Sequence, residues 1–236
     1  MKSFANLKAR LEALPELRKG VEQGGLFSQF LANVELAKQQ LVEASEAAAC
    51  SAPVLPSPQY DVARRSVRSS GRIAKNLAEK IRKDANTISD RGTEESFLKL
   101  TENAREALRR AKLGWQSELQ SRIEKWETIA GVVSALGQQT PAIKTQAGQL
   151  KRSVDLLSQA KEKLPCSQSD AAHVKGHLEQ LADSVSQLGL DTPFGKFLQA
   201  AASEQGAPLS EMENEAVAEK VKSLKLDKVF RVRLSS

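Results

Sequence analysis

The feature that most constrains the fold is a long proline-free stretch, 93–140, in which apolar residues recur at helical spacing. The apolar positions are Leu100, Ala104, Leu108, Ala111, Trp115, Leu119, Ile123, Trp126, Ala130 and Val133. Their nine steps cover 33 positions, a mean of 3.67 residues, which is the period of a nearly straight or slightly right-handed bundle. Thr93 followed by two glutamates is typical of a helix start. The sequence therefore predicts one helix of about 44 residues, about 66 Å long, that ends before Pro141.

Two further segments have a shorter apolar period. One contains Ile143, Ala147, Leu150, Val154 and Leu157, and the other contains Val174, Leu178, Leu181, Val185 and Leu188. Each set has a mean spacing of 3.5 residues, which is the coiled-coil period. We expect the two helices to pack as an antiparallel pair. Their apolar faces would also offer a seam for association with a second copy or with another subunit.

The N-terminal part is predicted to be a helical hairpin that is separate from the main body. Pro15 interrupts the first helix, and Gly24–Gly25 is predicted to form a hinge before a second helix that begins at Leu26. Residues 50–60 contain three prolines, so we expect an extended, semi-rigid linker there. The predicted domains are a hairpin (1–49), a Pro-rich linker (50–60), a helical bundle (61–225) and a C-terminal strand or tail (226–236).

The hydrophobic period changes at the C-terminus. Residues 228–234 read KVFRVRL, in which Phe230, Val232 and Leu234 occupy every second position. This two-residue period is typical of a β-strand. A lone strand cannot satisfy its own backbone groups, so we expect it to add to a partner's sheet edge, to pair with a second copy or to remain a tail. The predicted fold class is therefore all-α, an elongated antiparallel helical bundle or coiled coil with one short C-terminal strand.

Composition limits the class of protein and the compartment. Aromatic residues make up 4% of the chain, which leaves few side chains to build a large concave ligand pocket. The two cysteines show no paired spacing, which favours a reducing compartment. The sequence contains neither a signal peptide nor an apolar run near the length of about 20 residues that a membrane helix needs. We therefore expect a cytoplasmic protein, and we do not expect it to bind membranes.

The sequence offers little for catalysis. It contains none of the common nucleotide-binding or hydrolase motifs, and it has two histidines in total. Those two, His173 and His177, are one helical turn apart, with Asp170 and Cys166 just ahead of them. Such a set can bind Zn²⁺, but histidines beside an apolar helical stripe more often cover that stripe. We therefore assign no catalytic, cofactor-binding or metal-binding residue and expect a protein without enzymatic activity.

Positive charge is concentrated in one segment. Residues 61–92 contain nine Lys or Arg and four Asp or Glu, a difference of +5 within a chain of net charge +6. The apolar stripe of this helix is predicted to contain Ile73, Leu77, Ile81 and Ile88. On a helical wheel centred on Ile73, Arg64, Lys75 and Arg82 lie within about 20° of the opposite direction, Arg68 lies about 140° from Ile73, and Arg72 and Lys83 lie nearer the flanks of the stripe. We name the following residues the basic ridge: Arg64, Arg65, Arg68, Arg72, Lys75 and Arg82. Such a ridge can bind phosphate groups, although many charged helix faces are simply solvated.

Two functions follow as expectations. The first is a non-catalytic adaptor or structural subunit that docks other protein subunits through its coiled-coil faces and through Phe230, Val232 and Leu234. The alternative is a helical protein that binds the phosphate backbone of nucleic acid through the basic ridge. Its sequence specificity should be weak, because the only aromatic residue in 60–83 is Tyr60. Self-association into a homo-oligomer is compatible with both functions, and neither requires a cofactor.

Overall fold

The computed structural model describes residues 2–12, 21–84, 87–88, 90–201, 207 and 209–226. Within these ranges the chain forms helices, turns and short connections and no strand, which confirms the all-α class. The predicted C-terminal strand with Phe230, Val232 and Leu234 lies outside the described residues. None of the described helices combines the length and the apolar composition that crossing a lipid bilayer would require.

The contacts divide the chain into two units. Unit 1 consists of Met1–Ser117 together with Leu164–Asp170, and unit 2 consists of Glu118–Lys163 together with Ala171–Ser236. The predicted domain limits, with a boundary at 50–60, are a different division of the chain and stay a prediction.

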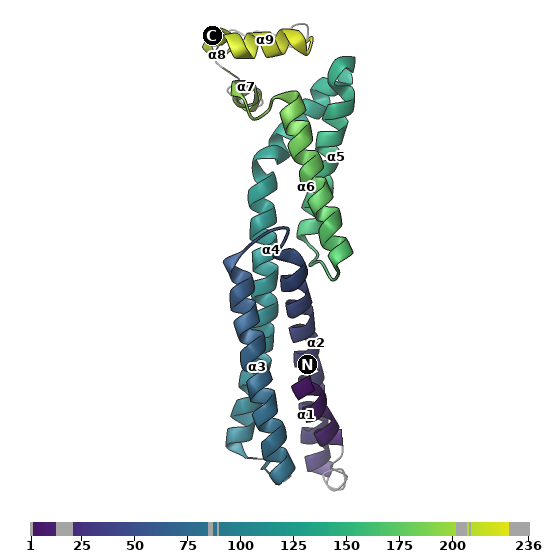
Figure 1. The fold of residues 1–236 in the computed structure, drawn as a ribbon, viewed down its shortest axis with the longest axis vertical. Helices are drawn as coiled ribbons and strands as arrows, with labels where there is room; N and C mark the ends of the chain where they lie inside the picture. Colours follow the sequence, from purple (N-terminus) through teal and green to yellow (C-terminus); the bar gives the residue numbers. More distant parts are fainter. Residues whose placement is uncertain are drawn as a thin grey trace. The chain divides into compact units, whose positions relative to one another are not determined.

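Unit 1 contains α1 (Lys2–Glu12), α2 (Val21–Ser51), α3 (Pro58–Lys83) and the first part of α4 (Arg91–Gln139) (Figure 1). Both α1 and α2 pack against α3 as well as against each other. The predicted hinge at Gly24–Gly25 is wrong, because α2 begins at Val21 and continues through both glycines. Intrinsic helix propensity is a weak prior that the surrounding structure overrides.

The Pro-rich segment between α2 and α3 is a tight turn and not the extended linker that we expected. The backbone amides of Val54 and Leu55 both donate to the carbonyl of Ser51, at 3.0 and 2.8 Å. Leu55 is buried in the core of the unit. Ser57 then caps α3, and Pro58 occupies the first turn, where its missing N–H leaves no helical hydrogen bond unmade. The prolines therefore terminate one helix and start the next.

Three contacts fix the register between α3 and α4. Tyr60 lies against Gly114, Asn103 Nδ2 donates to Ser69 Oγ (3.3 Å), and Lys80 Nζ donates to Thr93 Oγ1 (2.9 Å). Residue numbers fall along α4 as they rise along α3, so the two helices are antiparallel neighbours.

The long central helix is confirmed. α4 is a single helix of 49 residues, and the turn that follows it begins with Pro141. Nine of the ten predicted stripe positions are buried; the exception is Leu108, which is half-buried beside the fully buried Ala107. Large apolar side chains such as Trp115 and Ile123 occupy these positions, and for this reason the sequence predicts the buried face of α4 correctly.

Unit 2 contains the second part of α4, the short helix η3 (Pro141–Ile143), α5 (Lys144–Lys161), α6 (Gln168–Leu188), α7 (Pro193–Ala201), α8 (Leu209–Met212) and α9 (Glu215–Ser223). The predicted apolar positions of α5 and α6 are buried, except that Leu178 is half-buried. Two side-chain hydrogen bonds join α5 to the second part of α4. Lys161 donates to Gln120 (2.8 Å) and Ser158 donates to Glu127 (3.0 Å), so the two helices are antiparallel. The apolar faces of α5 and α6, which have the 3.5-residue period, are therefore covered by other residues of the same chain.

The last helices are shorter than the sequence indicates. Residues 210–213 read SEME, which is a capping-box pattern for one continuous helix, but α8 spans only Leu209–Met212. A new helix, α9, begins after Asn214, whose side chain accepts a hydrogen bond from the amide of Ala216 (3.1 Å). Asn is at least as favourable an N-cap as Ser, which explains why a separate helix begins after Asn214.

Candidate nucleic-acid interface

The buried face of α3 agrees only in part with the one that the sequence indicated, because Leu77 and Ile81 are buried as expected but Ile73 is not at the centre of the face. Its buried residues are Tyr60, Ala63, Ser70, Ala74, Leu77, Ala78 and Ile81, whereas Ile73 is half-buried. The wheel centred on Ile73 was therefore wrong, because most of the buried side chains here are small. One signal in the sequence could have found the face, since none of these buried positions is charged.

Because the centre of the buried face is near Ala74, the angles of the cations are measured from that residue. At 100° per residue, Arg65, Arg72 and Lys83 lie within about 20° of the direction opposite Ala74. Arg68 and Lys75 lie about 100–120° from it, and Arg64 and Arg82 lie about 80° from it. All six residues of the basic ridge are exposed. The cations of α3 that face most directly away from the buried side are therefore Arg65 and Arg72 of the ridge, together with Lys83.

Some cations of α3 have partners in the fold. Arg64 pairs with Asp61 (3.2 Å) and also donates to the carbonyl of Ala48 on α2 (3.4 Å). Lys75 forms a longer ion pair with Glu79 (3.9 Å). Lys80 pairs with Asp90 (3.3 Å) and donates to Thr93, so it belongs to the contact between α3 and α4. These three side chains are therefore partly neutralised.

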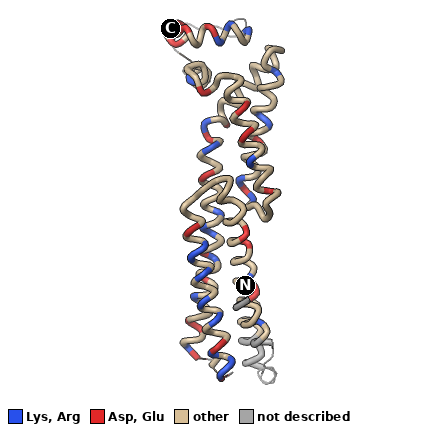
Figure 2. Tube along the Cα trace, viewed as in Figure 1, with Lys and Arg blue, Asp and Glu red and all other residues tan. Residues whose placement is uncertain are grey.

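Five other cations of the helix have no such partner. Within the described part of the chain, no ion pair or hydrogen bond is made by the side chains of Arg65, Arg68, Arg72, Arg82 and Lys83. We name these five the unpaired cations of α3. The two acids of the helix, Asp61 and Glu79, are already engaged, so α3 carries no free carboxylate to offset them. Figure 2 shows the resulting line of basic residues along the helix.

This face lacks the features that read a base sequence. Tyr60, the one aromatic residue of α3, is 1% exposed and packs against Gly114. A β-carbon at residue 114 would lie 2.8 Å from its ring, so the glycine is what allows the ring to be buried there. Without an exposed ring, bases have no stacking platform on α3. The face is therefore suited to phosphate groups and not to bases.

The two histidines are not assembled into a metal site. His173 is exposed, and His177 Nδ1 lies 3.3 Å from Gln180 Oε1. Among the described residues, no group of three or more His, Cys, Asp and Glu side chains is placed to hold a metal ion.

Unit 1 also has a shallow groove along α2, which our sequence reasoning missed. Its volume is about 460 Å³ and it is lined by Glu35, Lys38, Gln39, Val42, Glu43, Glu46 and Cys166. Glu35 is held by Lys8 (3.2 Å) and Lys38 (3.4 Å), and the hydrogen bond from Lys8 is the largest cause that lowers the pKa of Glu35. The recurrence of acids along α2 was visible in the sequence, but the approach of Cys166 was not.

Comparisons with known proteins assign no family. The chain matches no protein-family model, and neither a curated protein nor a solved structure shows significant similarity to it.

Proposed function

We propose that this protein is a non-catalytic helical binding protein and that the outer face of α3 binds the phosphate backbone of nucleic acid. The observation that supports this proposal most strongly is the set of unpaired cations of α3, which are exposed on a helix without a free acid. Exposed charges without partners keep their full capacity to replace the counterions of a nucleic acid.

The length of the face suits a duplex. Arg65 and Lys83 are 18 residues apart, which corresponds to about 27 Å along a helix at 1.5 Å per residue. That distance equals the axial length of about eight base pairs at 3.4 Å each. Four of the five unpaired cations are arginines, whose planar guanidinium groups bind phosphate oxygens in a bidentate manner. Binding should therefore be strong at low salt and largely independent of base sequence.

A direct test is fluorescence anisotropy with a labelled duplex of about 20 base pairs at several salt concentrations. If five phosphates are neutralised, the logarithm of the affinity should fall with the logarithm of salt with a slope of about −4.5. Between 50 and 200 mM salt the affinity should then fall by about 10²–10³-fold. Absence of binding at low salt would contradict the proposal.

A second experiment distinguishes nucleic acid from a lipid surface, because anionic headgroups also attract a basic helix. The protein is sedimented with vesicles that contain anionic lipid and, separately, with neutral vesicles. We expect no sedimentation under salt conditions in which the duplex is bound. Tighter binding to the anionic vesicles than to the duplex would contradict the assignment to nucleic acid.

Docking of a protein partner remains a second proposal, supported by the alternation of Phe230, Val232 and Leu234. The experiment is to compare the partners that co-purify with the full chain and with a chain that lacks 228–236. Loss of a specific partner on deletion would support strand addition, and an unchanged set of partners would exclude it.

A further inference from the structure

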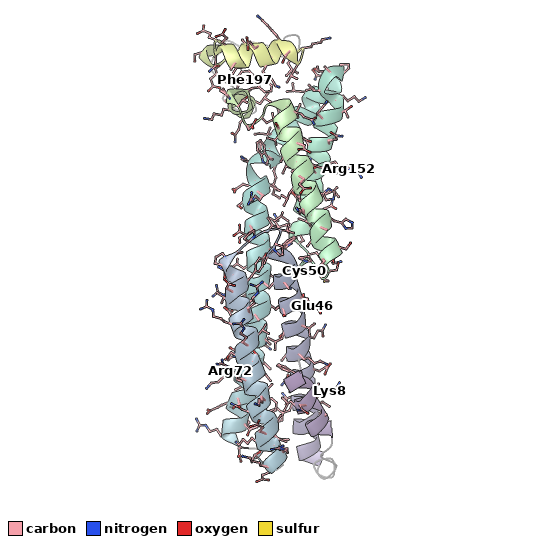
Figure 3. The ribbon with its side chains drawn as sticks, in the orientation of Figure 1. Lys8, Glu46, Cys50, Arg72, Arg152 and Phe197 are labelled. Atoms are coloured by element: carbon pink, nitrogen blue, oxygen red, sulfur yellow. The ribbon has the colours of Figure 1, made fainter. Side chains whose placement is uncertain are left out.

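The groove on α2 leads to a pair of cysteines. Its lining residues on α2 recur every three or four positions from Glu35 to Glu46, so they share one face of the helix. The next position of this face is Cys50, one turn after Glu46 (Figure 3). Cys166, which is 116 positions later in the chain, lines the groove against the same face. Both cysteines belong to unit 1.

The two thiols differ in their exposure. Burial is the main cause that raises the pKa of the half-buried Cys50 thiol, and the charges of Glu46, Asp170 and Cys166 raise it further. Cys166 itself is exposed, and its Sγ donates weakly to the carbonyl of Leu164 (3.6 Å). Cys50 is therefore the shielded thiol of the pair, and Cys166 is the accessible one.

Cys166 lies in a connecting segment and not in a helix. Residues 162–167 are turn, bend or irregular structure between α5 and α6, so they can shift without breaking a helix. A disulfide requires the two Cα atoms to be within about 7 Å of each other. The amide of Cys166 is held by Asp170 Oδ2 (3.1 Å), a single hydrogen bond that can be exchanged for one to water.

We propose that Cys50 and Cys166 form a reversible intramolecular disulfide that connects the end of α2 to the loop between α5 and α6. This inference is independent of the proposed function, because neither thiol belongs to the basic ridge. The bond would close a loop of 116 positions and covalently link two segments that are distant in sequence.

The oxidation can proceed by exchange with a small disulfide such as glutathione disulfide. The Cys166 thiolate attacks one sulfur of the reagent, and a glutathione thiolate leaves. The Cys50 thiolate then attacks Cys166 Sγ in the mixed disulfide and releases the second glutathione. In total, two protein thiols lose two protons and two electrons, and the reagent is reduced to two glutathione molecules. Cys166 reacts first because it is exposed and Cys50 is shielded.

The test uses the full chain in a glutathione redox buffer of increasing oxidised fraction. We expect both free thiols to disappear together and the protein mass to fall by about 2 Da, since two hydrogens are lost. Peptide mapping without reductant should recover one cross-linked product that contains Cys50 and Cys166. Size-exclusion chromatography should show no covalent dimer.

Two matched variants complete the design. Cys50→Ser should stop at the mixed disulfide, with one glutathione attached to Cys166. Cys166→Ser should react at least tenfold more slowly, because the shielded Cys50 is then the thiol that remains. Circular dichroism confirms that both variants stay helical. The proposal is overturned if the wild type ends with one glutathione on each cysteine, or if its disulfides join two copies of the chain.

Discussion

Two antiparallel neighbours in unit 1, α3 and the first part of α4, use positive charge in different ways. Over 58–83 there are eight Lys or Arg and two Asp or Glu, and over 91–117 there are six and four. On α4, Glu106 accepts hydrogen bonds from both Arg109 and Arg110, and Arg91 pairs with Glu95. On α3, most of the cations form no ion pair with any residue that the structure describes.

The two helices therefore differ in whether their arginines are paired with acids of the same helix or are left to bind another molecule. An arginine that pairs with a glutamate of its own helix gives up part of its capacity to attract a phosphate, because the pair is nearly neutral. The unpaired cations of α3 retain that capacity. The number of basic residues in a segment is therefore a poorer guide to binding than the number that the fold leaves without a partner.

The two helices also differ in what they bury. α4 buries large side chains such as Trp115, whereas α3 buries mainly alanine and serine next to Tyr60, Leu77 and Ile81. We therefore expect α4 to contribute more of the stability and α3 to contribute the binding surface. The predictions below test this division.

The largest effect on stability should come from Trp115→Ala. The side chain is 1% exposed, and its removal leaves a cavity that should lower the free energy of unfolding by about 3–5 kcal/mol. Chemical denaturation followed by circular dichroism measures the change. Leu113→Ala is the control, because Leu113 is 39% exposed and should change stability by less than about 1 kcal/mol. Similar losses in both variants would contradict the assignment of the core.

An intermediate effect should come from the glycines of the two helices. Gly114→Ala places a β-carbon 2.8 Å from the Tyr60 ring, so we expect a loss of about 1–3 kcal/mol. Gly71→Ala on α3 meets nothing within 4 Å and should raise stability by about 0.5–1 kcal/mol through helix propensity. Thermal unfolding should therefore move in opposite directions for the two variants. A shift in the same direction would show that α3 and α4 do not approach as described.

The smallest effect should be the dependence of stability on pH at Glu106. Hydrogen bonds from Arg109 and then Arg110 lower the pKa of this carboxyl to about 2. Because the folded pKa lies below the ordinary value of 4.5, the stabilisation is present above pH 4.5 and is lost as pH falls toward 2. The side chain is 36% exposed, so the contribution should remain under about 1 kcal/mol.

Urea denaturation between pH 2 and pH 6 measures this contribution. Glu106→Gln should be less stable than the wild type at pH 6, and the difference should disappear near pH 2. A constant difference across this range would mean that the ion pairs of Glu106 do not form in solution.

The sequence predicted α4 better than α3 for a physical reason. On α4, large apolar residues at regular spacing occupy the buried positions, so the period indicates the face directly. On α3, Ala63, Ser70 and Ala74 are buried because small side chains permit close helix packing, and the larger Ile73 lies at the edge. A search for hydrophobic residues identified Leu77 and Ile81, but it placed the centre of the face at Ile73 because it passed over the small residues that are also buried.

The six ridge residues were predicted from charge alone, and all six are exposed. The spacings of Asp61 with Arg64 and of Lys75 with Glu79 allow ion pairs on a helix, and the sequence shows these spacings. It could not show that Arg64 also donates to the carbonyl of Ala48 on α2. It also could not show that Cys166 reaches the α2 groove, because that contact joins positions that are distant in the chain. Local patterns predict elements, but contacts between distant positions require the fold.

The central claim is that α3, and not net charge in general, binds phosphate. The most direct measurement compares two triple variants with equal charge loss, Arg65→Gln/Arg68→Gln/Arg72→Gln on α3 and Arg91→Gln/Arg109→Gln/Arg110→Gln on α4, in duplex binding across salt concentrations; all three α4 arginines pair with glutamates of their own helix. The α3 variant should bind at least tenfold more weakly at low salt, and its salt slope should be shallower by about 2.7. The α4 variant should change the slope by less than about 1. Equal losses in the two variants would contradict the claim.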